Sequence, residues 1–128
     1  MNSYKQLLSR IMLLCIVMVT TMATAKESDP EVEYLLSAVG NSDCLFIRNG
    51  TEHPPAEAEA HLRMKYRKGA RYVSSADDFI ARIASKSSWS GRPYQIHCPG
   101  HELQSSSQWL NDRLNRYRSA RKPQDQAP

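Results

Sequence analysis

Hydrophobic residues recur at intervals of three and four along four segments of the chain, and this spacing is typical of amphipathic helices. Residues that favour helix ends bound these segments. Asp29-Pro30 can open the first helix, Gly40 can end it, and Ser75 can cap the third. The pattern predicts helices over residues 30–39, 55–68 and 76–84, and a fourth that is capped within Ser105–Ser107 and runs to about residue 118.

Two short apolar stretches between these helices are typical of β-strands. They cover residues 44–50, with the sequence CLFIRNG, and residues 93–98, with the sequence PYQIHC. No alternating run follows Asn49-Gly50, so we predict no hairpin there, and the next residues, TEHPP, are typical of a stiff connector. The element order α-β-α-α-β-α predicts a small α+β domain. In this fold a two-stranded antiparallel ribbon is packed by about four helices.

The first 25 residues follow the pattern of an export signal. Lys5 and Arg10 precede an apolar run over residues 11–22, and Ala-Thr-Ala at 23–25 is a typical cleavage signal. Because the run is shorter than the ~20 residues that span a membrane, we expect cleavage rather than a stable membrane anchor. We therefore expect a periplasmic or secreted protein with a signal peptide at 1–25, a single domain at 26–118 and a disordered tail at 119–128.

Removal of the predicted signal peptide also changes the charge balance. It leaves 103 of the 128 residues and lowers the net charge from +4 to +2, because Lys5 and Arg10 are lost. A positive charge this small does not favour nucleic-acid binding. His97, Cys98 and His101 lie close together in the sequence, but their spacing matches no zinc site. We expect a monomer that needs no metal and no cofactor.

Each predicted strand contains one cysteine, and a single antiparallel register accounts for both. If Cys44 lies opposite Cys98, then Phe46 faces Ile96 on the same side of the ribbon. These two cysteines remain after signal cleavage, and an even number of cysteines in an oxidising compartment favours a disulfide. The sequence therefore predicts a bridge between Cys44 and Cys98.

Four motifs, in this order, are similar to those of a known family. They are FIRNG at 46–50, AxxHLxxK at 58–65, AxxFI at 76–80 and SxSGxPY at 88–94. Together they resemble the YfeK-like family of small exported proteobacterial proteins, a domain of unknown function. The resemblance covers about residues 31–117. It implies an exported location and a shared fold, but no activity.

Seven residues near one end of the predicted ribbon are candidates for a ligand-binding site. The strand register places Arg48 opposite Tyr94, and helical spacing places His61 and Lys65 on one face of the second helix. A short connector joins the first strand to this helix, so we expect these four residues to lie together. A serine-rich loop after the third helix can offer hydroxyl groups to an anion or a sugar. The candidates are Arg48, Asn49, His61, Lys65, Ser88, Ser90 and Tyr94.

The same candidates also have purely structural interpretations. Asn49 suits a turn, and Arg48 can stack on Tyr94 across the ribbon. His61 and Lys65 can lie on a solvated edge of their helix. Serine-rich loops are, in addition, common at helix ends.

We expect a non-enzymatic binding module of the cell envelope, whose partner is a small anionic or glycan-like ligand or another envelope protein. The alternative is a hydrolase that pairs Ser88 or Ser90 with His61. The sequence contains no GxSxG nucleophile elbow, and its spacing places no acidic residue to orient His61. Binding is therefore the leading hypothesis.

Overall fold

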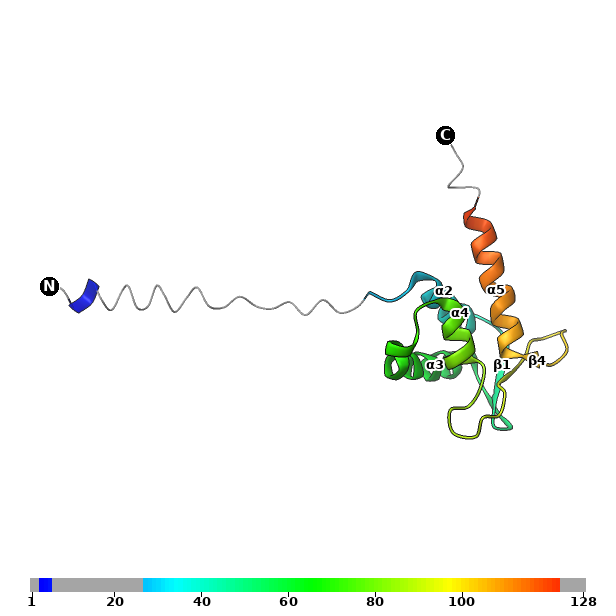
Figure 1. Ribbon diagram of the computed structural model, residues 1–128. Helices are drawn as coiled ribbons and strands as arrows, with labels where there is room; N and C mark the ends of the chain where they lie inside the picture. Colours follow the sequence, from blue (N-terminus) through cyan, green and yellow to red (C-terminus); the bar gives the residue numbers. More distant parts are fainter. Residues whose placement is uncertain (1–2, 6–26, 123–128) are drawn as a thin grey trace.

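The computed structural model describes residues 3–5 and 27–122 of the chain. Most of the predicted signal peptide, and residues 123–128 of the predicted tail, lie outside the described residues. The described part is a small α+β domain with four main helices and a four-stranded antiparallel sheet (Figure 1). Its elements are α2 (Pro30–Gly40), β1 (Leu45–Arg48), β2 (Thr51–His53), α3 (Pro55–Gly69), the 3₁₀ turn η1 (Ala70–Tyr72), α4 (Ala76–Phe79), the π-helix η2 (Ile80–Ala84), β3 (Gln95–His97), β4 (Gln104–Ser105) and α5 (Ser106–Arg121).

The helices begin where the capping pattern predicts. The Asp29 carboxylate accepts hydrogen bonds from the first backbone N–H groups of α2, and Pro30 is the first residue of this helix. Ser75 caps α4 and Ser105 caps α5 in the same way. Helix α5 continues to Arg121, past the predicted start of the tail.

The central strands pair in the predicted register. In the antiparallel pair of β1 and β3, Phe46 lies opposite Ile96. One position beyond the pair, Cys44 and Cys98 form a disulfide. Both the predicted register and the predicted bridge are therefore confirmed. A disulfide is typical of proteins that fold in an oxidising compartment.

The prediction of a two-stranded ribbon without a hairpin is wrong. Strand β2 forms a hairpin with β1 through Asn49-Gly50, and β4 adds a fourth strand beside β3, which gives the order β2-β1-β3-β4. Asn49 and Gly50 have φ angles of 50° and 79°, as a two-residue hairpin turn requires. The sequence pattern missed β2 because none of its residues is buried, so its side chains do not alternate between apolar and polar.

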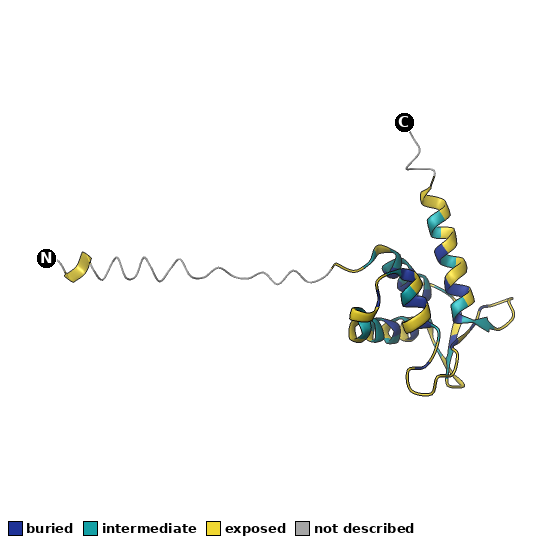
Figure 2. Cartoon of the chain, in the orientation of Figure 1, coloured by how far each residue is buried: buried dark blue, intermediate teal, exposed yellow. Residues whose placement is uncertain are grey.

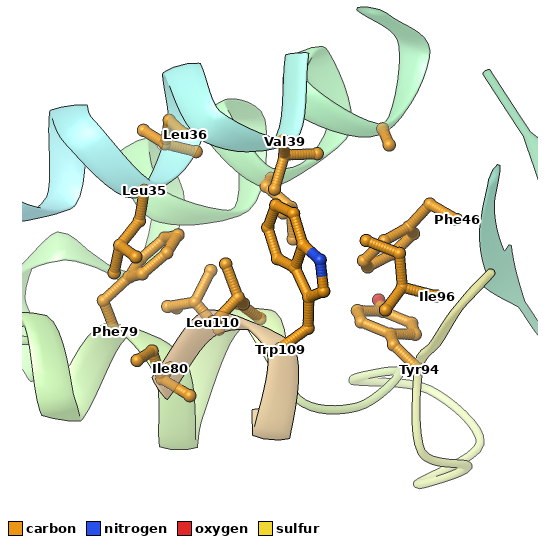
Figure 3. Packing of buried hydrophobic residues seen from close by; sticks show 14 of the residues in the cluster. Leu35, Leu36, Val39, Phe46, Phe79, Ile80, Tyr94, Ile96, Trp109 and Leu110 are labelled. Atoms are coloured by element: carbon orange, nitrogen blue, oxygen red, sulfur yellow. The ribbon is translucent and has the colours of Figure 1, made fainter. Parts of the chain in front are cut away.

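One hydrophobic core lies between the helices and the sheet (Figure 2). Helices α2, α3, α4 and α5, together with η2, contribute most of its side chains. Phe46, Tyr94 and Ile96 contribute from the sheet side, and Figure 3 shows the Trp109 ring between them and the helices. Tyr94 is only 1% exposed, although its hydroxyl group is polar, so that hydroxyl needs hydrogen-bond partners inside the fold.

Among the residues that the structure describes, no helix is both long enough and apolar enough to cross a lipid bilayer.

Loss of the disulfide should strongly destabilise the domain. The bridge joins residues separated by 54 positions, and closing a loop of this length contributes about 4 kcal/mol in the chain-entropy model. We expect the double variant Cys44→Ser/Cys98→Ser to melt at least about 10 °C below the wild type in thermal unfolding. Wild-type protein treated with a reductant serves as the control and should melt with the variant. Equal melting temperatures for oxidised and reduced wild type would contradict a stabilising role.

Candidate functional site

A cleft lies where the C-terminal half of α3 meets η2, the end of β1 and the loop before β3. Its volume is about 560 Å³. We call it the basic cleft. It is lined by Arg48, Asn49, His61, Met64, Lys65, Lys68, Gly69, Ile83, Ser87, Ser88, Trp89 and Tyr94.

The predicted meeting of Arg48, His61, Lys65 and Tyr94 is confirmed. Arg48 Nη1 lies 2.6 Å from His61 Nδ1, and His61 Nε2 lies 3.3 Å from the Tyr94 hydroxyl oxygen. Lys65 Nζ lies 3.2 Å from the same oxygen. These side chains come from β1, α3 and the residue before β3, so one hydrogen-bonded cluster joins three segments of the chain.

The local structure explains why these side chains converge. His61 and Lys65 are one helical turn apart on α3 and therefore share a face. The β1–β3 register brings the end of β1, with Arg48, beside Tyr94. The cation over the Tyr94 ring is Lys65, at 4.8 Å from the ring centre, rather than the Arg48 of the structural interpretation. Lys65 thus contacts both the ring and the hydroxyl of one tyrosine.

The π-helix η2 helps to hold Lys65 in place. Lys65 Nζ donates to the carbonyl oxygen of Ile83 at 2.6 Å and to that of Lys86 at 2.9 Å. Carbonyl groups at a helix end have no partner within the helix, so an ammonium group can satisfy them. With the Tyr94 hydroxyl, Lys65 has three acceptors, which is the full capacity of its ammonium group. Lys65 therefore links α3 to η2 and to the loop that follows it, and it also carries a positive charge in the cleft.

The hydrogen bonds determine the protonation state of His61. An arginine side chain is only a donor, so His61 Nδ1 must accept from Arg48. The proton of the neutral ring then lies on Nε2, which donates to the Tyr94 hydroxyl oxygen. Burial, and then the charges of Arg48 and Lys65, lower the pKa of His61 to about 4. His61 is thus neutral at pH 7.

Tyr94 is left with one unused donor. Its hydroxyl oxygen has two lone pairs, and these accept from His61 and from Lys65. The hydroxyl hydrogen therefore has no acceptor among the described residues. Burial raises the pKa of Tyr94, while Arg48 lowers it, so the hydroxyl keeps its proton at neutral pH. A buried O–H without an acceptor favours a ligand that supplies one.

The charge of Lys65 persists at neutral pH. Burial, and then the charge of Arg48, lower the pKa of Lys65 to about 8. Below that pH the cleft contains the fixed charges of Arg48 and Lys65, and Lys68 adds a third cation to its wall.

No carboxylate lines the basic cleft. Arg48 also makes no ion pair among the described residues. By contrast, Arg118 pairs with Glu31 and Asp77, and it borders a larger hollow of about 820 Å³. A third hollow, near the disulfide, has aspartates as well as arginines in its wall. A wall that contains cations but no carboxylate therefore distinguishes the basic cleft from both.

Of the three remaining predicted residues, two line the cleft and one does not. Ser88 lines the cleft, whereas Ser90 does not and donates to Asn49 Oδ1 at 2.6 Å. Asn49 lines the cleft and also donates to Ser87 Oγ at 3.4 Å. Asn49 and Ser90 therefore hold the serine-rich loop against the hairpin turn.

Sequence reasoning missed several cleft residues. Met64 and Lys68 follow His61 at helical spacing, so the periodicity of α3 could have identified both. Ser87 and Trp89 belong to the loop that was recognised, but no pattern places their side chains. Ile83 and Gly69 become part of the cleft only through packing.

The cleft contains no preformed Ser–His pair. Both nitrogens of His61 are occupied, by Arg48 and by Tyr94, and no hydrogen bond joins His61 to a serine or a carboxylate among the described residues. Among all the residues that the structure describes, no group of three or more His, Cys, Asp or Glu side chains is placed to hold a metal ion.

Comparisons with known proteins return relatives of unknown function. A model described as a family of unknown function (DUF5329) matches residues 26–118. The uncharacterized protein YfeK of Salmonella typhimurium strain LT2 is 36% identical over 67 residues, which are 52% of this chain and 56% of that protein. The chain thus spans about half the length of this curated relative. No solved structure matches the chain. The predicted resemblance to YfeK-like proteins is confirmed.

Acid should destabilise the domain through His61. Its pKa is 6.5 in the unfolded chain and about 4 in the fold, so the unfolded state binds the proton more readily between these values. Stability is therefore lost as the pH falls from 6.5 towards 4. His61→Gln can accept from Arg48 and donate to Tyr94 without titrating. In thermal unfolding we expect it to reduce the loss over this range by a few degrees, or about 1 kcal/mol.

His101→Gln is the matched control, because His101 is exposed and lies outside the cleft. This variant should keep the wild-type pH dependence. An identical pH dependence in all three proteins would contradict a neutral, half-buried His61.

Proposed function

The chain belongs to the family of unknown function DUF5329, and we propose from the geometry of the basic cleft that it binds small ligands that carry an oxyanion. One observation carries this proposal: the cleft combines unneutralised cations with a buried hydroxyl donor, and no carboxylate lines it. Carboxylate, phosphate and sulfate groups have the complementary chemistry, since they are negatively charged and accept hydrogen bonds.

Arg48 is the principal contact in this proposal. Its guanidinium group has five N–H donors, and one Nη1–H bonds to His61. The remaining donors match the geometry of an oxyanion, which arginine binds through two parallel hydrogen bonds. His61 orients the guanidinium group through this hydrogen bond, because its neutral ring accepts from Arg48 without adding charge.

Tyr94 and the two lysines complete the site. The free Tyr94 O–H donates to the oxyanion, and Lys65 and Lys68 add positive potential without needing direct contact. Partial burial strengthens these interactions, because charges attract more strongly away from bulk water. The proposed role is binding rather than hydrolysis, since the cleft lacks a nucleophile activated by a base.

We also propose that the protein acts in the periplasm or outside the cell. The N-terminal sequence pattern and the Cys44–Cys98 bridge support this location.

Arg48→Ala should strongly weaken oxyanion binding. Titration of phosphate, sulfate and acetate at low ionic strength, followed by calorimetry and thermal shift, should show binding to the wild type. Loss of a charge-assisted hydrogen-bonded contact costs about 1.5–3 kcal/mol, which corresponds to a roughly 10- to 150-fold weaker affinity. Arg48→Lys keeps the charge but loses the paired donors, so its affinity should be intermediate.

Arg92→Ala is the matched control, because Arg92 is exposed, carries the same charge and does not line the cleft. Its affinity should stay within about two-fold of the wild type, since exposed charges are strongly screened. Equal losses in the Arg48 and Arg92 variants would mean that only the net charge attracts the anion, and the proposed site would be wrong.

Export predicts a defined N-terminus. Protein recovered from the periplasm or the medium should have the intact mass of a chain that starts at Lys26, with its two remaining cysteines bridged. Full-length protein found in the membrane fraction would contradict this proposal.

A further inference from the structure

Trp89 stands at the rim of the basic cleft with 97% of its surface exposed. Tryptophan is usually largely buried, as the other tryptophan of this chain shows: Trp109 is 5% exposed in the core. A fully exposed indole beside a cleft is therefore an unusual feature of a monomeric surface and needs an explanation.

The loop that carries Trp89 is held in place by hydrogen bonds. Ser87 N donates to the carbonyl oxygen of Arg92, and Gly91 N donates to that of Ser87, both at 3.0 Å. Ser90 donates to the hairpin turn at Asn49. The loop and the turn project together from one end of the domain and are largely exposed (Figures 1 and 2). The indole is thus presented by a braced loop, which lowers the entropy cost of a stacking contact.

The cleft also has an apolar wall. Met64, Ile83 and Trp89 line it together with the cations, and Met64 is 36% exposed. The volume of the cleft, about 560 Å³, lies within the range of small-molecule sites. It exceeds the volume that one carboxylate or phosphate group fills. The ligand should therefore have an apolar or flat body attached to its oxyanion.

We propose that the ligand is an acidic saccharide. The C–H face of its sugar ring stacks on Trp89, and its carboxylate or phosphate binds Arg48 and the Tyr94 O–H. A pyranose ring combines an apolar face with hydroxyl groups, so it matches an indole that has water on its other side. This inference rests on the proposed oxyanion function and deepens it, because it assigns the part of the ligand that the oxyanion site does not contact.

An anionic membrane surface fits this site less well. Tyr94 lines the cleft but is only 1% exposed, so it is out of reach of a flat bilayer. A single sugar residue can enter a hollow of this size, whereas a flat bilayer contacts only the rim. Exposed apolar side chains around the rim are also few, since Met64 and Trp89 are its only exposed large hydrophobic residues among those described.

Three small probes separate the ring from the charge. Glucuronate has both, acetate has the charge alone, and glucose has the ring alone. In calorimetry, wild-type protein should bind glucuronate about five- to ten-fold more tightly than acetate, as expected for one aromatic contact, and should bind glucose weakly. Acrylamide quenching supplies a direct readout: glucuronate should protect the exposed Trp89, while the buried Trp109 stays a constant reference.

Variants then assign the contact. Trp89→Ala should lower glucuronate affinity to that of acetate and leave acetate binding unchanged, whereas Trp89→Phe should keep part of the advantage. Tyr72→Ala is the matched control, because Tyr72 is an exposed aromatic residue (60%) that does not line the cleft. It should bind like the wild type.

The outcomes distinguish this inference from the function on which it rests. If glucuronate binds no better than acetate, or if Trp89→Ala keeps the advantage, the saccharide inference is overturned and the oxyanion site stands. If Trp89→Ala abolishes binding to anionic vesicles while glucuronate shows no advantage, the partner is a membrane instead. If Arg48→Ala leaves the affinity for acetate unchanged, the oxyanion site itself is wrong.

Discussion

The antiparallel pairing of β1 with β3 is the constraint on which the rest of the structure depends. Its register places Phe46 opposite Ile96 and so directs the apolar face of the sheet towards the helices. The disulfide closes one end of this pair, and the other end brings Arg48 to Tyr94. A shift of one residue would turn every side chain to the opposite face. It would expose the core and separate the site residues in the same step.

Some cationic side chains of this domain pair with carboxylates, whereas others have only neutral partners. Arg63 links α2 to α3 through Glu33 and Glu59, and Arg118 links α5 to α2 and α4 through two further carboxylates. In the basic cleft, Lys65 is satisfied by carbonyl and hydroxyl oxygens, which leave its charge uncompensated, and Arg48 bonds to a neutral histidine. Uncompensated charge beside a core costs stability. Its presence here, and not at the helix junctions, supports a functional cleft over a structural one.

Family membership adds a shared fold to this picture but no chemistry, because the matching family and the curated relative are both of unknown function. A fold alone does not define an activity, so the function has to be argued from the site. In that site, His61 and Lys65 both donate to the Tyr94 oxygen, and this leaves the hydroxyl hydrogen without an acceptor among the described residues. The exposed Trp89 bears on the rest of the ligand, since it offers an aromatic surface to the uncharged part of the molecule.

The sequence by itself determined the four helices, the β1–β3 register, the disulfide and the meeting of Arg48, His61, Lys65 and Tyr94. These features are encoded by capping residues, by helical periodicity and by apolar residues that alternate along the strands, all of which are local patterns. Only the tertiary structure decided the hairpin and the edge strands, because β2 and β4 bury no apolar face and are held by backbone hydrogen bonds to a neighbour. It also decided the π-helix that anchors Lys65, the free donor of Tyr94 and the place of Trp89. These depend on distances between segments that are remote in sequence, and no local pattern records such distances.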